Sequence, residues 1–313
     1  MKNLLVLLLA MLLAINCAGP KFNYHSHKTA THHKSSGIHK YSASDHTHHN
    51  SEKVKVQPTE AKNEPTETHK TETKAVAGTF KSSKKLKAVL MVGPVTSDTD
   101  GTTLGYVEDL KFAAKVLEAN GVEVHGFYTP DNNWESIKKA CEGANFLLYK
   151  GHGVYDGSNP PKWVGGFCLK GSFPSSSDIS TELKLAPNAI IMISGCFTAG
   201  NAGDDIGKIE LPEAKRRIEM YSKPFFDIKA ACYYANWYPS AFHDFIEKLF
   251  ANSTLGEAYK GYGNGGNPAD IKEFKYAYQP SYQLFVGSED YSGKTAFNNA
   301  FVGDPNKKLS DFF

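Results

Sequence analysis

FLLYKGHGVY (residues 146–155) and NAIIMISGCFTAG (residues 188–200) are the two stretches that decide the fold. Each begins with a short apolar run and then reaches a glycine, which is typical of a buried strand followed by a sharp turn. We expect these strands at residues 144–150 and 189–194. In a parallel sheet the carboxyl ends of the strands meet at one edge, and ligands bind beyond that edge. His152 and Cys196 follow the two strands and are therefore expected to lie close together.

The segments on either side alternate between strand and helix patterns, which predicts one α/β domain over residues 85–313. Its sheet is expected to be doubly wound and mostly parallel, with helices on both faces. Further strands are expected at residues 86–95, 122–128, 163–169 and 226–234. Helices are expected at residues 107–120, 134–141, 175–183 with a Ser or Asp cap, 212–221, 239–250, and 257–262 with Ser253 as the cap.

His152 and Cys196 have the chemistry of a nucleophilic pair. Cysteine attacks a carbonyl as a thiolate, and a nearby imidazole can supply that form and then protonate the leaving amine. The backbone N–H groups of Gly153 and Cys196 are the candidates for binding the oxyanion. The alternative is a core cysteine beside a histidine that only caps a carbonyl. The placement of both residues at matching strand ends favours the catalytic pair.

The remaining cysteines and histidines of the domain are expected to be structural. Cys168 and Cys232 sit within apolar strand patterns, and Cys141 lies in a predicted helix. His125 falls in the middle of a strand and His243 on an amphipathic helix. The net charge is only +2 and no basic helix or aromatic-basic stripe is present, so nucleic acid is not an expected partner.

The first residues predict export. Lys2 precedes an apolar run from Leu4 to Ala14, which is short for a membrane span and typical of a secretory signal. The sequence LAINC at residues 13–17 resembles a bacterial lipobox. This resemblance implies a lipoprotein signal at residues 1–17, a lipid on Cys17 and attachment to a membrane of the cell envelope. Secretion without a lipid is the alternative.

Residues 18–84 predict a disordered linker. Between Pro20 and Lys84 there is no Leu, Met or Trp, so burial cannot offset the entropy of ordering the chain. Nine of the twelve histidines lie here. Such a tract can bind zinc, nickel or copper weakly. A polar spacer whose charge rises below about pH 6.5 is the favoured interpretation.

The two strand-end motifs resemble those of the caspase-like (clan CD) cysteine peptidases, which include caspases, legumains, clostripain, separase and gingipains. In this group one hydrophobic strand ends in His-Gly and a second ends in a small residue followed by Cys. AFVGDP at residues 300–305 is similar to gingipain-type bacterial members, whereas Gly195 departs from the alanine common before the cysteine. The resemblance implies His152 as general acid and Cys196 as nucleophile, with no obligatory cofactor. Calcium activates some relatives.

The resemblance also implies an S1 pocket beside these strand ends and the exit of the next strand. Candidate residues there are Asp156, Asp204, Asp205 and residues 236–238, which include Trp237. An acidic pocket floor favours Arg or Lys at P1 through charge-assisted hydrogen bonds. The alternative is that these acids are solvated surface groups.

We therefore expect a cysteine endopeptidase that hydrolyses protein or peptide substrates at the cell envelope. Two alternatives stay open. One is a non-catalytic surface protein that uses a caspase-like scaffold for binding. The other is a metal-binding lipoprotein in which the histidine-rich linker carries the function.

Overall fold

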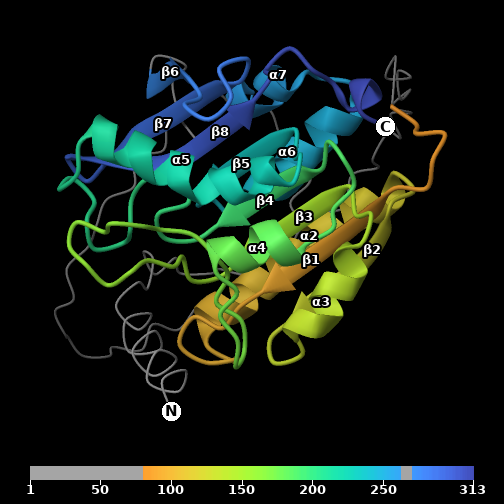
Figure 1. The fold of residues 1–313 in the computed structure, drawn as a ribbon, viewed down its shortest axis with the longest axis horizontal. Helices are drawn as coiled ribbons and strands as arrows, with labels where there is room; N and C mark the ends of the chain where they lie inside the picture. Colours follow the sequence, from red (N-terminus) through yellow and green to blue (C-terminus); the bar gives the residue numbers. More distant parts are fainter. Residues whose placement is uncertain (1–79, 262–269) are drawn as a thin grey trace, which may run out of the picture. The chain divides into compact units, whose positions relative to one another are not determined.

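A single mixed sheet organises the folded part of the chain, and the computed structural model describes residues 80–261 and 270–313. The strands are Lys87–Val92 (β1), Glu123–Tyr128 (β2), Phe146–Lys150 (β3), Ile190–Ser194 (β4), Cys232–Asn236 (β5), Ile271–Lys275 (β6), Gln283–Tyr291 (β7) and Lys294–Gly303 (β8). Their order in the sheet is β2-β1-β3-β4-β5-β8-β7-β6 (Figure 1). The first five strands in this order are parallel, and the last three pair antiparallel. The predicted α/β class with a mostly parallel sheet is confirmed.

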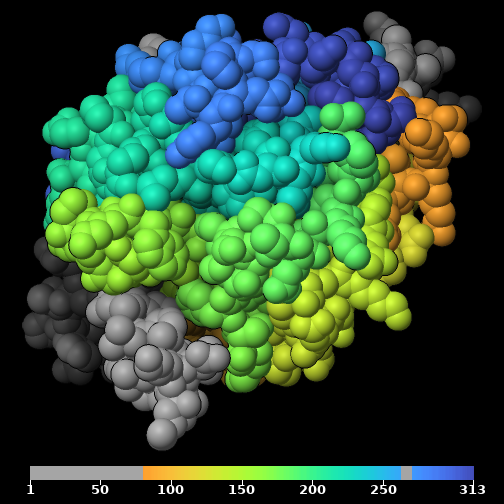
Figure 2. Space-filling model, viewed as in Figure 1, coloured from red at the N-terminus to blue at the C-terminus, as the bar shows by residue number. Residues whose placement is uncertain are grey.

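Helices cover both faces of this sheet. One face packs against α2 (Gly101–Ala119), α6 (Ala241–Phe250) and α7 (Leu255–Lys260). The other packs against α3 (Trp134–Cys141), α4 (Ser176–Glu182) and α5 (Leu211–Asp227). A 3₁₀ turn, η2 (Leu309–Asp311), lies near the C-terminus. In the space-filling view, side chains of α3, α4 and α5 cover the face that is shown (Figure 2).

β3 and β4 lie next to each other near the middle of the sheet, and every residue in them is buried. Burial on both faces explains why their sequences are continuous apolar runs without alternation. Their register pairs Phe146 with Ile190 and Lys150 with Ser194. The two strands therefore end level with each other.

Short polar motifs begin several of the helices. Asp100 is the N-cap of α2, and its carboxylate accepts hydrogen bonds from the backbone N–H groups of Thr102 and Thr103. Ser175 caps α4 through a capping box with Asp178, as the sequence predicted. The cap of α7 is Thr254, one residue later than the predicted Ser253, because Glu257 completes a capping box with Thr254.

Residues 226–231 were wrongly predicted to be in a strand. α5 continues to Asp227 through Pro224, and the strand begins only at Cys232. Ile218, Tyr221 and Phe225 recur at helical spacing, and all three are buried against the sheet. Packing of this apolar face keeps the chain helical past the proline, which locally removes a helix hydrogen bond.

The strand predicted at residues 163–169 is also absent from the described residues, where only isolated bridges occur, at Tyr155–Val164 and Leu169–Ser172. Gly165 and Gly166 adopt φ angles of 136° and 116°. These positive values interrupt an extended strand, and few residues other than glycine adopt them.

The sequence analysis did not predict β6, β7 or β8. Their alternating polar and apolar residues form an antiparallel extension that covers the outer side of β5. None of the helices in residues 80–261 and 270–313 combines the length and apolar character that crossing a membrane requires. Residues 1–17, Cys17 and the linker as far as residue 79 lie outside the described residues.

Candidate active site

His152 and Cys196 occupy equivalent positions on two neighbouring strands. Each lies two residues beyond a member of the register pair Lys150–Ser194. The Gly151 N–H donates to the Ser194 carbonyl oxygen at 3.1 Å, which carries the pairing one residue past the strands. Both side chains are largely buried, with 4% of His152 and 6% of Cys196 exposed.

The two turns touch through their backbones. A Cβ atom added at Gly153 would lie 1.7 Å from the carbonyl oxygen of Cys196, which no side chain can tolerate. A Cβ atom at Gly195 would lie 2.7 Å from the Gly151 carbonyl oxygen and 3.0 Å from the Gly153 nitrogen. Glycine at both positions is therefore what lets the histidine turn and the cysteine turn approach this closely.

A hydrogen bond to the loop that follows β1 orients the His152 ring. Nε2 of His152 lies 2.5 Å from the carbonyl oxygen of Val95. Because a carbonyl oxygen only accepts, Nε2 carries the proton, and Nδ1 is the ring nitrogen left for proton exchange. The Tyr149 hydroxyl donates to the His152 carbonyl oxygen at 2.9 Å and fixes the backbone of the same turn.

The Val95 carbonyl is in turn held by the start of α2. The Val95 N–H donates to Oγ1 of Thr103 at 2.8 Å, and that hydroxyl donates to the Asp100 carboxylate at 2.6 Å. Thr103 is fully buried. The cap of α2 is therefore connected by three hydrogen bonds to the imidazole of His152.

The predicted oxyanion donors lie where the two turns meet. Gly153 is buried, and among residues 80–261 and 270–313 no acceptor bonds its N–H. Buried N–H groups are nearly always bonded, so a buried one without an acceptor is suited to receive an oxygen from a ligand. The backbone of Cys196 lies beside it.

The loop after Cys196 is tightly bonded. Phe197 adopts a φ of 70°, and its N–H donates to the Asn201 carbonyl oxygen at 2.7 Å. The Asn201 N–H donates to the Phe297 carbonyl oxygen of β8 at 3.1 Å. A non-glycine residue at positive φ carries strain, which the surrounding hydrogen bonds offset.

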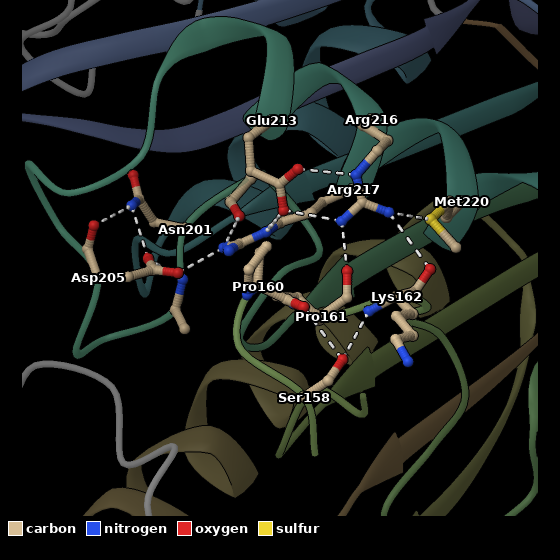
Figure 3. Close-up of polar contacts among 12 residues, drawn as sticks. Ser158, Pro160, Pro161, Lys162, Asn201, Asp205, Glu213, Arg216, Arg217 and Met220 are labelled. Carbon is tan, nitrogen blue, oxygen red and sulfur yellow. Dashed lines mark hydrogen bonds and ion pairs between the residues drawn. The ribbon is translucent and has the colours of Figure 1, made fainter. Parts of the chain in front are cut away.

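Arg217 of α5 fixes this loop through charge (Figure 3). Its guanidinium donates to Asp205 Oδ2 at 2.5 Å, to Glu213 Oε1 at 2.7 Å and to the Gly200 carbonyl oxygen at 3.0 Å. Only 2% of the Arg217 side chain is exposed. Burial raises the pKa of Glu213, but hydrogen bonds from Arg216 and Arg217 outweigh it, so its pKa is lowered overall.

The same helix also holds the loop after His152. Arg216 donates to Glu213 at 2.7 Å and 2.8 Å and to the Pro161 carbonyl oxygen at 2.5 Å (Figure 3). Glu213 thus accepts hydrogen bonds from Arg216, which holds the loop after His152, and from Arg217, which holds the loop after Cys196. α5 is the element that sets the two loops relative to each other.

A pocket of 570 Å³ lies between these loops, and Tyr155, Phe197, Asp204 and Asp205 are among its lining residues. The rings of Tyr155 and Phe197 are 5.0 Å apart. Asp204 is exposed, whereas the Asp205 carboxylate bonds Arg217 and Asn201. Asp156 lies nearby and accepts hydrogen bonds from Ser158 and Lys162.

A second polar region lies at the exit of β5, on the face covered by α2 and α6. Trp237 is half-buried, and its backbone N–H donates to the Asn298 carbonyl oxygen at 3.2 Å. The Asn298 amide donates to Glu289 at 2.5 Å, and the Tyr238 hydroxyl donates to the same carboxylate. The sequence analysis missed Glu289, because a single acid in an alternating strand carries no motif.

Lys150 and Asp109 form a buried ion pair beside this region, with 2.8 Å between Nζ and Oδ2. Burial lowers the pKa of Lys150, and Asp109 opposes that effect. Tyr106 of α2 lies against the Lys150 ammonium, 5.6 Å from the ring centre. Burial raises the pKa of Tyr106, and the negative charge of the Cys196 thiolate raises it further. α2 therefore brings a tyrosine into the electrostatic environment of Cys196.

The other thiols of the described chain are unsuited to nucleophilic attack. Burial raises the pKa of Cys141 to about 12 and of Cys168 to about 11, and it also raises that of Cys232. A thiol with such a pKa stays protonated near neutral pH. Cys168 lies in the glycine-containing loop rather than in the predicted strand.

His125 of β2 and His243 of α6 contact residues of β2 and α2, respectively. His125 pairs with Glu123 at 2.9 Å. His243 packs edge-on against the Phe112 ring, with 4.4 Å between centres. Within residues 80–261 and 270–313 no three His, Cys, Asp or Glu residues are grouped to hold a metal ion.

Comparison of the chain with models of known protein families and with curated proteins finds no match. The assignment of a function therefore depends on the residues of the site itself.

Proposed function

We propose that the protein is a cysteine endopeptidase of the caspase-like type, with Cys196 as nucleophile and His152 as general acid and base. The observation that carries this proposal is the matched position of the two residues, each two residues beyond the level pair Lys150–Ser194. The contact between Gly153 and the Cys196 backbone adds to it. If His152 or Cys196 had only a structural role, the two turns would not need to be rich in glycine or to touch each other.

In the proposed reaction the Cys196 thiolate attacks the carbonyl carbon of the scissile peptide bond, and a carbon–sulfur bond forms. The developing oxyanion accepts hydrogen bonds from the N–H groups of Gly153 and Cys196. His152, protonated, gives its proton to the leaving nitrogen as the carbon–nitrogen bond breaks. Water then attacks the thioester carbon and His152 takes a proton from it. The carbon–sulfur bond breaks, the carboxylic acid leaves, and the Cys196 thiolate and the protonated His152 are restored.

The hydrogen bond from Nε2 of His152 to Val95 supports this assignment of roles. It holds one ring nitrogen permanently as a donor, so Nδ1 is the nitrogen that exchanges the proton with the thiol and the amine. It also stabilises the imidazolium form, because a carbonyl oxygen interacts more strongly with a charged donor. No third side chain is needed to orient the ring.

We extend the proposal to the cell envelope, where the enzyme would cut protein or peptide substrates. The apolar run at residues 4–14 and the lipobox-like sequence before Cys17 support an exported, lipid-anchored protein. Two experiments test this part separately from catalysis. One is hydrolysis of the lipid anchor by a lipase, applied to the intact chain. The other is metabolic labelling of Cys17 with a palmitate analogue.

The test of catalysis uses the full chain and a panel of acyloxymethyl ketone peptides that differ at P1, with intact-mass analysis and with and without calcium. We expect one adduct, absent in Cys196→Ala, slower to form in His152→Ala and unchanged in Cys168→Ala, which serves as the matched thiol control. A folded sample that forms no adduct with any peptide contradicts the proposal and favours a binding scaffold.

A further inference from the structure

A second pocket, of 420 Å³, lies between α4 and α5. Side chains of both helices line it, together with Trp163 from the loop after His152 and Tyr278 from the loop between β6 and β7. It shares no lining residue with the pocket beside Cys196, so it is a separate site. Pockets of roughly 300–1,000 Å³ are the size that small ligands occupy.

Two exposed aromatic rings meet at this pocket. The exposed fraction is 42% for Trp163 and 51% for Tyr278. The two residues come from loops that are far apart in the sequence, and the fold brings them to the same pocket. Single exposed apolar side chains are ordinary, whereas large ones gathered at one place indicate a binding surface.

Both rings belong to segments that are held in place by other residues. The Tyr278 ring packs edge-on against Tyr276, with 5.6 Å between centres. Tyr276 is fully buried, and its hydroxyl lies 3.0 Å from that of Ser222. The Trp163 carbonyl oxygen accepts from the Asp156 N–H at 3.3 Å. Rings on segments that are already ordered lose little entropy when a ligand binds.

The polar groups of the pocket carry no net charge. Lys223 and Asp227 of α5 are its charged lining residues, and their side chains pair with each other at 2.6 Å and 2.9 Å. Ser177 and Ser180 of α4 also line it. The Ser180 hydroxyl donates to the Ser177 carbonyl oxygen at 3.0 Å, and its own oxygen can still accept. The pocket therefore offers donors and acceptors without favouring an ion of either sign.

A third serine of α4 adds an unsatisfied hydroxyl. Ser176 lines the pocket, and its Oγ is buried with no hydrogen-bond partner among the residues that the structure describes. Buried side-chain polar atoms usually have a partner, and an exception requires an explanation. A hydroxyl group supplied by a ligand would satisfy Ser176.

This combination of groups restricts the class of ligand. An apolar side chain would cover the rings, but it would take water from the serine hydroxyls and the ion pair without replacing the lost hydrogen bonds, which is costly. A charged ligand would meet a pair of charges that already neutralise each other. A sugar ring has a face of C–H groups that can lie against aromatic rings, and its hydroxyls both donate and accept.

We infer that this pocket binds an uncharged sugar ring. Trp163 and Tyr278 lie against the C–H face of the ring, and the serine hydroxyls of α4 bond its hydroxyls. The inference goes beyond peptide cleavage and does not depend on Cys196. It gives the protein a carbohydrate ligand at a site of its own.

The test is saturation-transfer difference NMR of the full-length protein with the methyl glycosides of glucose, galactose, mannose and N-acetylglucosamine. Glucuronic acid and glucosamine are added as charged relatives of glucose, and N-acetylphenylalanine amide as an apolar probe. We expect at least one uncharged glycoside to bind, with the strongest saturation on the protons of one face of its ring. The charged sugars and the apolar probe should bind more weakly.

Variants then place the sugar in the pocket. Trp163→Ala and Tyr278→Ala should each weaken binding by about tenfold, since each removes one aromatic face. Phe112→Ala and Tyr291→Ala are the matched controls, because these rings are 50% and 40% exposed and do not line the pocket. Ser176→Ala should weaken binding without lowering the melting temperature, because it removes a buried hydroxyl that has no partner.

Three outcomes would contradict the inference. The first is a folded wild-type protein that binds none of the uncharged glycosides. The second is binding that survives in both Trp163→Ala and Tyr278→Ala, which would put the sugar elsewhere. The third is tighter binding of the apolar probe than of any sugar. None of these outcomes bears on the proposed peptidase, because none measures a reaction of Cys196.

Discussion

Arg217 extends from α5 to the loop after Cys196, where its Nη1 lies 2.5 Å from Oδ2 of Asp205. The same nitrogen donates to the Gly200 carbonyl oxygen, four residues after Cys196. Through Glu213, Arg217 is also linked to Arg216, which holds the loop after His152. One buried cation therefore helps to fix the loops that follow His152 and Cys196.

We predict that Arg217→Met lowers the free energy of unfolding by about 3 kcal/mol, because removing one partner of a buried ion pair leaves the other charge uncompensated. Unfolding in urea measures the loss. Lys223→Met is the control, since Lys223 pairs with Asp227 on the same helix at the surface. Its effect should stay below about 0.5 kcal/mol. Equal losses for the two variants would show that the Arg217 network does not stabilise the fold.

The contact between the two turns gives a second prediction. Gly153→Ala must separate the histidine and cysteine turns, because its Cβ atom would lie 1.7 Å from the Cys196 carbonyl oxygen. A displacement near 1 Å costs roughly 100-fold in rate. We therefore expect the rate of Cys196 labelling by a peptide ketone to fall by about that factor.

Gly101→Ala is the matched control for this substitution. Gly101 begins α2, and a Cβ atom there would meet nothing within 4 Å. Alanine favours a helix over glycine by roughly 1 kcal/mol, so this variant should be as stable as the wild type or more so. A Gly153→Ala protein that labels at the wild-type rate would mean that the contact between the turns is unimportant for the reaction.

The sequence carried the information for the two strand ends because that information is local. An apolar run followed by His-Gly or Gly-Cys indicates the end of a strand, and no other part of the fold has to be known to see it. β3 and β4 lie where those runs predicted. The C-terminal end of α5 could not be predicted in this way, because it depends on packing. Phe225 is as apolar as a strand residue, and only its burial with Ile218 and Tyr221 makes the segment helical.

The partners of the charged residues could not be predicted in this way. Asp205, Glu213 and Arg217 are separate polar residues in the sequence, and they meet because α5 lies beside the loop that follows β4. The sequence suggested Asp205 as a substrate-binding acid, whereas its carboxylate bonds Arg217 in the structure. Glu289 could not be identified before β8 was known to pair with β5, and β7 with β8.

The hydroxyl of Thr103 provides a third prediction, because it connects the cap of α2 to the carbonyl that orients His152. Thr103→Val removes the acceptor for the Val95 N–H and leaves that buried group unbonded, at a cost of about 1–3 kcal/mol in unfolding free energy. We also expect slower labelling of Cys196 and a shifted pH profile of labelling, since the Val95 carbonyl loses its support. Thr103→Ser should restore both.

A structural role alone would not produce this pattern. If Thr103→Val lowers stability while the pH profile of labelling stays that of the wild type, Thr103 supports the helix and has no part in positioning His152. Melting temperature and labelling are therefore measured on the same samples.

The carboxylate of Asp100 gives a prediction on pH. Burial raises its pKa, but hydrogen bonds from Thr103, Ser97 and Thr96 outweigh burial and lower the pKa from 3.8 to about 2. A pKa lowered by folding means that the ionised form stabilises the native state. This stability is present above pH 3.8 and is lost as the pH falls toward about 2.

We therefore expect Asp100→Asn to be less stable than the wild type at pH 7 by about 1 kcal/mol, a value reduced from the full pKa shift because solvent screens a partly exposed group. The difference should shrink between pH 4 and pH 2, where the wild-type carboxyl becomes protonated. Unfolding in urea at several pH values measures it, with Asp131→Asn, an exposed loop residue, as the control. A difference that stays constant over this range would mean that the charge of Asp100 does not stabilise the cap, and that its hydrogen bonds to the loop before α2 are made equally well by a neutral amide.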